Sequence, residues 1–286
     1  MRFSVVIPTH NRAHTLRQTL AALAAQTHAD YDVIVVDDGS ADGTAAMVKA
    51  EFPNVTYLQQ PNRGPAAARN LGIEAAQGEV VGFTDDDCLP PPDWLARLAD
   101  GYARYPHVAG VGGSLRAPPE LLRHNAFAQY ERYLAVDVYH AGAAEVVAGF
   151  ECPGGGANNI SYRRAVLDEV GRFDVRFPVA AGEDTDLKLR VCQRGYQLLY
   201  LPVWMTHLQD YTWPRFRRQY YVRGVGRNYF EALHGPGAPS RLKVALRGLR
   251  RLLDFPRDLI VMRPRRLALV KLADGLLQCQ GQWAGR

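Results

Sequence analysis

Three consecutive carboxylates, Asp85-Asp86-Asp87, directly follow the apolar run Val80–Phe83. A short, β-branched run that begins just after Gly78 predicts a buried parallel strand. The acidic residues would then lie at its carboxyl end, where open α/β sheets bind ligands. Adjacent like charges repel one another, so the cluster needs a compensating cation or polar ligand, and oxygen donors suit Mg²⁺ or Mn²⁺. A solvated acidic turn is the simpler alternative.

A second pair of carboxylates, Asp37 and Asp38, ends the apolar run that begins at Tyr31. An aspartate there can accept a hydrogen bond from a base N–H or a ribose hydroxyl, and Gly39 permits a tight turn. Capping of the following helix is the alternative role. Arg69, farther along, can reach a diphosphate, but pairing with Asp37 or Asp38 within the protein is the favoured interpretation.

Acidic residues also begin a later helix, in Glu183-Asp184-Thr185-Asp186. Carboxylates in a first turn commonly serve the helix dipole or a cap, and one of them can instead act as a general base. His207 follows an apolar strand, where a lone histidine is usually structural; an acidic metal site would make it a candidate ligand. The glycines Gly154–Gly156 allow close approach of a ligand to the backbone or form a flexible turn.

The elements that must position these groups alternate between strand and helix over the first hundred residues. This alternation predicts βαβ units, hence an α/β fold with a mostly parallel central sheet and helices on both faces. Residues 107–162 have a less regular pattern. We expect strands at 3–8, 31–37, 55–58, 80–84 and 197–201, the last ended by Pro202, and helices after residues 12, 40 and 182 and over 65–76.

The composition limits the classes of protein. With 286 residues and 47% hydrophobic content, the chain can bury a full core. Its 4 cysteines are widely separated, which argues against a zinc site or a disulfide framework and favours reduced thiols in the cytoplasm. The first apolar run is too short for a signal peptide or a membrane span. We therefore expect a cytoplasmic protein.

The charge is divided unevenly along the chain. From Tyr211 onward there are 16 Lys/Arg against 4 Asp/Glu, a net +12, whereas residues 1–210 carry −7. We therefore predict a first domain over 1–210 and a basic, largely helical region over 211–286. Within it, Arg241–Leu253 predicts an amphipathic helix, which lies on an anionic membrane surface or packs its apolar stripe against the rest of the protein. No recognition motif supports nucleic-acid binding.

Taken together, these segments resemble the family 2 glycosyltransferases with the Rossmann-like GT-A fold, an α/β/α sandwich. The resemblance covers about residues 1–210 and rests on six motifs in the family's order and spacing. They are Val5–Arg12, Val36–Thr44, Asn62–Asn70, Asp85–Asp87, Gly171–Asp174 and Gly182–Leu187. The Q-x-x-R-W sequence of processive members is absent, so addition of a single sugar is favoured over polymer synthesis.

The resemblance implies a role for each residue. Asp184 would be the catalytic base, with Asp87 and His207 as ligands of a divalent cation, Mn²⁺ or Mg²⁺. Asp38 would contact the nucleotide base and Asp85 the ribose or diphosphate. The remaining donor-site candidates are Pro8, Thr9, Asn11, Arg12, Arg69 and Asp86, and those for the donor or acceptor sugar are Gly155, Gly156 and Glu183.

The expected activity is metal-dependent, inverting transfer of one sugar, as by a hexosyltransferase. A UDP-sugar is the favoured donor and a saccharide or lipid-linked molecule the acceptor, in assembly of cell-surface polysaccharide or glycolipid. The enzyme would be cytoplasmic, peripheral on the inner face of the plasma membrane. A nucleotidyltransferase and a degenerate nucleotide-sugar-binding scaffold are the alternatives. The first would be expected to have a glycine-rich phosphate loop after the first strand, and Pro8–Arg12 contains no glycine.

Overall fold

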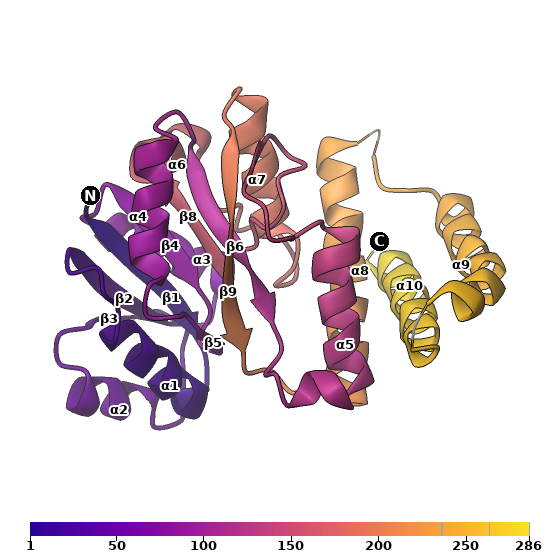
Figure 1. Ribbon diagram of the computed structural model, residues 1–286, viewed down its shortest axis with the longest axis horizontal. Helices are drawn as coiled ribbons and strands as arrows, with labels where there is room; N and C mark the ends of the chain where they lie inside the picture. The colour runs from indigo at the N-terminus through magenta and orange to yellow at the C-terminus, as the bar shows by residue number, and fades with distance from the viewer. Residues whose placement is uncertain (236, 263, 286) are drawn as a thin grey trace. The chain divides into compact units, whose positions relative to one another are not determined.

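The computed structural model describes residues 1–235, 237–262 and 264–285. The chain forms two compact units (Figure 1). Unit 1 comprises Met1–Arg116, Ala135–Val175 and Asp184–Leu208, and unit 2 comprises Ala117–Leu134, Arg176–Glu183 and Gln209–Arg286. The carboxylate cluster, the glycines at 154–156 and His207 all belong to unit 1.

A central sheet runs through unit 1, with nine strands among the described residues in the order β3-β2-β1-β4-β8-β6-β9-β5 and β7 paired to β9. The strands are β1 (Phe3–Thr9), β2 (Tyr31–Asp37), β3 (Thr56–Gln59), β4 (Val80–Thr84), β5 (Cys88–Leu89), β6 (Gly110–Arg116), β7 (Val146–Ala148), β8 (Asn159–Arg163) and β9 (Leu198–His207). The first four strands and their order of appearance agree with the sequence-based expectation.

Helices cover both faces of this sheet, because alternate side chains of each buried strand point to opposite sides. Val5 and Ile7 pack with α1 (Ala13–Ala24), α2 (Thr44–Glu51) and α4 (Trp94–Arg104). Val6 and Ile34 pack on the other face, with α3 (Pro65–Ala75), α6 (Arg164–Val170) and α7 (Glu183–Gln193). The expected α/β/α sandwich is confirmed.

One central strand runs against its neighbours. Strands β1 to β4 pair in parallel, and so do β6 and β9, but β8 is antiparallel to both β4 and β6. Strands β6 and β8 come from the section that had no regular pattern in the sequence. The reversal of β8 brings its beginning to the carboxyl end of β4, with Thr84 opposite Asn159.

The expectation that Pro202 ends the last strand is wrong. Strand β9 continues to His207, and its pairing with β6 shifts register so that Gly112 lies opposite Tyr200 and Ser114 opposite Trp204. Because proline cannot donate to the ladder, it is tolerated at such a bulge. The extra length carries His207 to the sheet edge where the acidic cluster lies.

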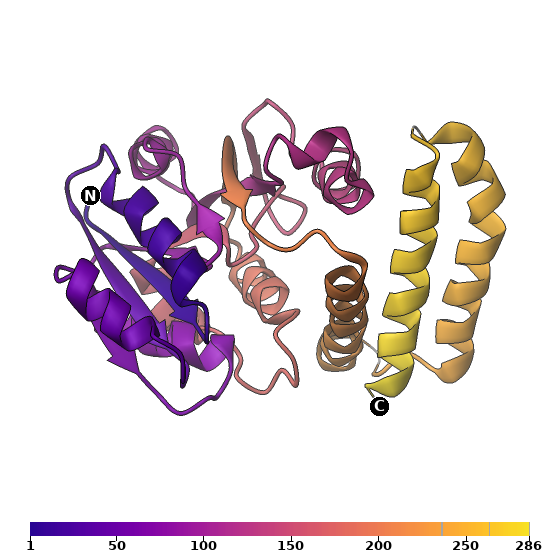
Figure 2. The ribbon, with the colours of Figure 1, turned by 90° about the horizontal axis from the view of Figure 1, so that it is seen from below.

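Unit 2 is helical, as expected for the carboxyl-terminal region. It contains η1 (Leu121–Arg123), α5 (Ala126–Tyr133), α8 (Trp213–His234), α9 (Arg241–Val261) and α10 (Arg266–Ala284), while η2 (Leu134–Val138) follows α5. Figures 1 and 2 place α10 between α8 and α9. No helix in the described part of the chain has the length and apolar composition needed to cross a membrane.

Glycines allow α8 and α10 to approach closely. A Cβ atom at Gly224 would lie 2.1 Å from the backbone oxygen of Gln278, and one at Gly281 would lie 2.0 Å from that of Tyr221. A polar pair joins α10 to α9, since Lys271 donates to Asp258 at 2.9 Å. Unit 2 is thus a packed helical body with its own apolar cluster.

A buried asparagine joins three strands and one helix of unit 1. Asn159 accepts a hydrogen bond from the Trp94 indole N–H at 3.0 Å. Its amide donates to the backbone oxygens of Ser114 at 2.9 Å and Val203 at 3.1 Å. Every polar atom of this buried side chain therefore has a partner, as buried polar groups require.

We predict that Asn159→Leu lowers the free energy of unfolding by about 2–4 kcal/mol, because it leaves an indole N–H and two carbonyl oxygens buried without partners. Urea denaturation followed by circular dichroism measures the change. Asn54→Leu, at an exposed turn, is the matched control and should change stability by less than about 0.5 kcal/mol. Equal stability of the two variants would contradict the role of Asn159.

Candidate active site at the carboxyl edge of the sheet

Each carboxylate of the acidic cluster faces a basic side chain. Arg12 donates to Asp86 at 2.9 Å and to Asp87 at 2.6 Å. Arg69 donates to Asp85 at 2.8 Å, and the His207 ring nitrogen lies 3.4 Å from the other oxygen of Asp87. The repulsion expected from the sequence is therefore compensated within the protein, at least in part.

The three carboxyl groups differ in acidity. Burial raises the pKa of Asp85, and it raises the pKa of Asp86 to about 6 although the Arg12 charge opposes the shift. Burial acts on Asp87 in the same direction. There, hydrogen bonding and charge from His207 and Arg12 outweigh burial and hold the pKa well below its usual range. Asp87 is therefore the most firmly anionic member of the cluster.

Strand pairing brings His207 to this cluster. It ends β9 opposite Cys88 of β5, and the next residue, Leu208, donates its backbone N–H to the Asp87 carbonyl oxygen at 2.7 Å. The potential ligand atoms of Asp87, Cys88 and His207 all lie within 4.8 Å of one another.

These residues fit a divalent cation of the Mn²⁺ type. A carboxylate and an imidazole suit such an ion, which takes its other ligands from phosphate and water. Cys88 lies within the same distance, but its soft sulfur suits Mn²⁺ or Mg²⁺ less well than oxygen donors do. Asp87 and His207 are therefore the pair that would hold the ion.

The end of β1 links the acidic cluster to the turn after β2. Pro8 and Thr9 lie opposite Val36 and Asp37, and the Thr9 hydroxyl donates to Asp86 at 2.7 Å. Asn11 takes a positive φ of 53° and accepts a hydrogen bond from the backbone N–H of Ala41 at 2.7 Å. The structure thus brings Pro8, Thr9, Asn11 and Arg12 to one edge of the sheet.

Both aspartates after β2 hold loops in place. Asp38 accepts hydrogen bonds from the backbone N–H groups of Arg63 and Gly64, each at 2.8 Å, and from the Gln60 side chain at 2.7 Å. Asp37 accepts from the Ser40 backbone at 2.7 Å and from the Tyr57 hydroxyl. The carboxylate of Asp38 therefore fixes the 60–64 loop beside the predicted base pocket; its contact with a base stays a prediction.

Arg69 pairs within the protein, as favoured, but with a partner that the sequence analysis did not name. It is buried on α3, donates to Asp85 and lies 5.5 Å from the Phe173 ring centroid. Asp85 lies two strands away from Asp37 in the sheet. Only the strand order decides which of these carboxylates α3 reaches.

The reversed strand β8 brings the glycine loop and Asp184 to the same edge. Because Thr84 and Asn159 are opposite each other, Ala157 lies near the start of the acidic cluster. The Asp184 carboxylate accepts from the Ala157 backbone N–H at 3.4 Å, and a Cβ at Gly156 would lie 3.5 Å from it. Among the described residues, no basic side chain forms an ion pair with Asp184.

The neighbours of Asp184 on α7 have other environments. Asp186 is buried and pairs with Arg190 at 2.7 Å. Glu183 is buried and falls in unit 2 with the segment 176–183. Asp184, by contrast, is partly exposed.

The sequence analysis missed Lys188, which holds the glycine loop. Its ammonium donates to the backbone oxygens of Cys152 and Gly154, at 2.5 and 3.0 Å, and a Cβ at Gly155 would lie 3.0 Å from its side chain. Burial lowers the pKa of Lys188. One feature of the sequence could have indicated this role: Lys188 lies one turn after Asp184 and on the same helical face as Val191.

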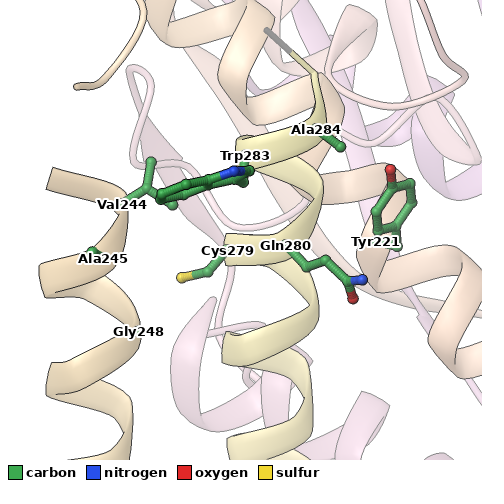
Figure 3. A pocket seen from close by; sticks show the side chains of 8 residues that line it. All are labelled: Tyr221, Val244, Ala245, Gly248, Cys279, Gln280, Trp283 and Ala284. Carbon is green, nitrogen blue, oxygen red and sulfur yellow. The ribbon is translucent and has the colours of Figure 1, made fainter. Parts of the chain in front are cut away.

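A separate pocket of about 430 Å³ lies in unit 2 (Figure 3). Cys279 and Trp283 of α10 point toward α9, and Gln280 points toward Tyr221 of α8. The lining residues are Tyr221, Val244, Ala245, Gly248, Cys279, Gln280, Trp283 and Ala284. None of them belongs to the predicted donor site.

The fold and the sheet-edge site define an α/β protein with an acidic cluster at the carboxyl ends of its parallel strands. Residues 4–170 match the family model "Glycosyl transferase family 2". This chain belongs to that family.

Two curated relatives come from Haloferax volcanii. Glucosyl-dolichyl phosphate glucuronosyltransferase is 31% identical over 180 residues, 61% of this chain and 56% of the relative. Glycosyltransferase AglE is 30% identical over 210 residues, 69% of this chain and 63% of the relative. The chain thus spans less than two thirds of the length of either protein.

Solved structures share the GT-A fold. The mannosyltransferase PcManGT from Pyrobaculum calidifontis, in complex with GDP-Man and Mn²⁺, matches with a TM-score of 0.67 at 20% identity, covering 100% of this chain and 88% of that one. S. aureus TarS 1-349 in complex with UDP matches with a TM-score of 0.58 at 18% identity, covering 99% and 91%. At these identities the likeness concerns the fold.

We predict that Asp38→Asn loosens the 60–64 loop, because an amide cannot accept from all three donors that now converge on the carboxylate. Hydrogen bonds to a charged group are each worth about 1.5–3 kcal/mol. Amide exchange at Arg63 and Gly64, measured by NMR, should accelerate about tenfold or more. Asp30→Asn, at an exposed position, serves as control. Unchanged exchange in the Asp38 variant would contradict this role.

Proposed function

We propose that the protein transfers one sugar from a nucleotide-sugar donor to an acceptor hydroxyl, with inversion at the anomeric carbon. The observation that carries the proposal is the convergence of Asp184, the glycine loop and the Asp85–Asp87 cluster at one edge of the sheet. The opposed pairing of Thr84 with Asn159 produces this convergence. Glycosyl transfer needs a base that accepts the proton of the attacking hydroxyl, and beside it a charged site that binds the departing diphosphate.

Asp184 is the proposed general base. It would take the proton of the acceptor hydroxyl as that oxygen attacks the anomeric carbon from the face opposite the diphosphate. Its partial exposure and lack of a paired cation among the described residues leave the carboxylate available to an incoming hydroxyl. The glycine loop, in which Lys188 donates to the carbonyl oxygens of Cys152 and Gly154, would permit close approach of a sugar at Gly155 and Gly156. Glu183 is proposed as a further contact of the donor or acceptor sugar.

Asp87 and His207 are the proposed ligands of a divalent cation, Mn²⁺ or Mg²⁺. Such a cation neutralises charge on a departing diphosphate and orients it. Arg12 would remain between Asp86 and Asp87, and Arg69 beside Asp85, where they limit the repulsion among the carboxylates. The proposal thus assigns different tasks to the three acidic residues.

The donor site would extend along the same edge. We propose that Asp38 contacts the base, in a pocket lined by Pro8, Thr9 and Asn11, and that Asp85, with Asp86, Arg12 and Arg69 nearby, lies against the ribose and diphosphate. UDP is the favoured nucleotide. Thermal unfolding with a panel of nucleotides tests this choice, since the true donor nucleotide should raise the Tm most.

We propose a saccharide or lipid-linked acceptor and a place in the assembly of cell-surface polysaccharide or glycolipid. One relative is named for action on glucosyl-dolichyl phosphate, which supports a lipid-linked acceptor. The +12 charge of residues 211–286 supports work at an anionic membrane surface. The corresponding location is peripheral, on the inner face of the plasma membrane. Without Q-x-x-R-W, we propose single addition rather than polymer synthesis.

The family match speaks against the nucleotidyltransferase alternative. The scaffold alternative is tested by turnover itself. A degenerate binder would retain nucleotide binding but show no transfer or donor hydrolysis with any nucleotide sugar.

Asp184→Asn should lower kcat by about two to four orders of magnitude, the usual contribution of general-base proton transfer. Donor affinity should remain within about threefold, because the amide keeps the size of the carboxylate and removes its basicity. Steady-state kinetics and calorimetric titration with the donor nucleotide measure the two effects. Asp137→Asn, an exposed carboxylate in the same unit, is the control. Near wild-type kcat in the Asp184 variant would refute the assignment.

Asp87→Ala should abolish turnover and weaken Mn²⁺ binding by at least about tenfold, since it removes the anionic ligand. Calorimetric titration with Mn²⁺ measures the affinity. Wild-type activity should disappear in excess chelator and return when Mn²⁺ or Mg²⁺ is added. Asp32→Ala, at the opposite end of β2, is the control and should leave the Mn²⁺ affinity unchanged. Full activity in excess chelator would overturn the metal assignment.

A further inference from the structure

Helix α9 has two apolar faces, and only one of them is packed. Val244 is buried, and Phe255 and Leu259 pack against the apolar cluster of unit 2. A second row of large apolar side chains is exposed: Leu242 at 68%, Leu246 at 54%, Leu249 at 50%, Leu253 at 71% and Ile260 at 72%.

Leu242, Leu246, Leu249 and Leu253 form one row, and Ile260 lies on the same side two turns farther along, beyond Pro256. Their spacings of four, three, four and seven positions place them on one side of an α-helix. Isolated exposed leucines are common on protein surfaces, but a contiguous apolar row marks a binding surface. The five residues Leu242, Leu246, Leu249, Leu253 and Ile260 are called the leucine row below.

Basic side chains border the leucine row. Lys243, Arg250 and Arg257 are all exposed and seven positions apart, so they form a line along one edge of it. The Arg250 side chain is 85% exposed and forms a 3.8 Å ion pair with Asp254 at the surface of the same helix. At the beginning of α9, Arg241 lies 5.5 Å from the ring centroid of Trp283, which is itself 48% exposed.

The basic residues beside the leucine row favour an anionic membrane over a second copy of this chain as the partner. A second copy of this chain could cover the row through a two-fold contact. The basic residues of each copy would then lie against the basic α9 of the other copy, and the two would repel each other. An anionic bilayer instead supplies phosphates for the cations and acyl chains for the leucines. Trp283 of α10, which lies beside Arg241 at the beginning of α9, suits the lipid–water interface.

We propose that α9 lies in the headgroup layer of an anionic membrane, with the leucine row toward the acyl chains and Lys243, Arg250 and Arg257 toward the lipid phosphates. This inference specifies which helix holds the protein at the membrane. It rests on the proposed function, because the binding would bring the enzyme to a lipid-linked acceptor. The binding itself requires no catalysis. Membrane affinity and sugar transfer can therefore fail independently.

The test is flotation of the full-length protein with vesicles of phosphatidylcholine alone or with 30% phosphatidylglycerol. We expect binding to the anionic vesicles that weakens as salt rises. The double variant Leu246→Gln/Leu249→Gln should need at least about tenfold more lipid for half-maximal binding, because two buried leucines are lost. Lys243→Gln/Arg250→Gln/Arg257→Gln should lose the preference for anionic vesicles.

The matched control is Val138→Gln/Val175→Gln, which removes two valines that are 42% and 50% exposed outside α9. It should bind vesicles as the wild type does, and circular dichroism checks that each variant is folded. Absence of wild-type binding to anionic vesicles at low salt overturns the inference. So does unchanged binding by the folded leucine variant, or a wild-type dimer in sedimentation that this variant abolishes.

Discussion

Mutual repulsion among Asp85, Asp86 and Asp87 is the constraint around which the sheet edge is built. Two like charges about 4 Å apart repel by roughly 4 kcal/mol near a protein surface, so a cluster with two buried carboxylates and a third partly buried requires positive charge from elsewhere. Arg12, from the segment after β1, and Arg69, from α3, supply that charge, and the His207 ring from the end of β9 also lies against Asp87. The edge therefore holds together only when three separate parts of the chain have converged.

The same convergence makes the three carboxylates unequal. Asp86 shares Arg12 and accepts from Thr9, yet burial still raises its pKa to about 6. Asp87 has two basic neighbours and is held anionic. A cluster of identical residues thus acquires one member suited to a cation and others suited to hydrogen bonding, through differences in environment alone.

Reversal of β8 has the largest consequence for chemistry. In a wholly parallel sheet, the segment before a central strand begins at the opposite edge from the acidic cluster. Because β8 runs antiparallel to β4, the loop before it arrives beside Asp85, and Lys188 secures that loop by two of its carbonyl oxygens. Unit 2 is held together differently, because its helices pack through glycines and polar pairs. Its helix α9 leaves one apolar row exposed.

Local pattern alone determined much of unit 1. The apolar runs at 31–37 and 80–84 became strands with the expected bounds, because buried parallel strands are continuous apolar segments. The acidic groups that end these strands could therefore be assigned to one edge from the sequence. The amphipathic pattern of 241–253 likewise predicted a helix, which extends to Val261.

Only the tertiary structure decided which groups meet. The partner of Arg69, the passage of β9 through Pro202 and the role of Lys188 depend on strand order, a register shift and a loop distant in sequence. The sequence also left open whether the leucines of 241–253 pack or remain exposed, and a single helix could use Val244 and Phe255 for packing while leaving Leu246 outside. Periodicity specifies which residues share a face, whereas the arrangement of neighbouring elements decides what covers that face.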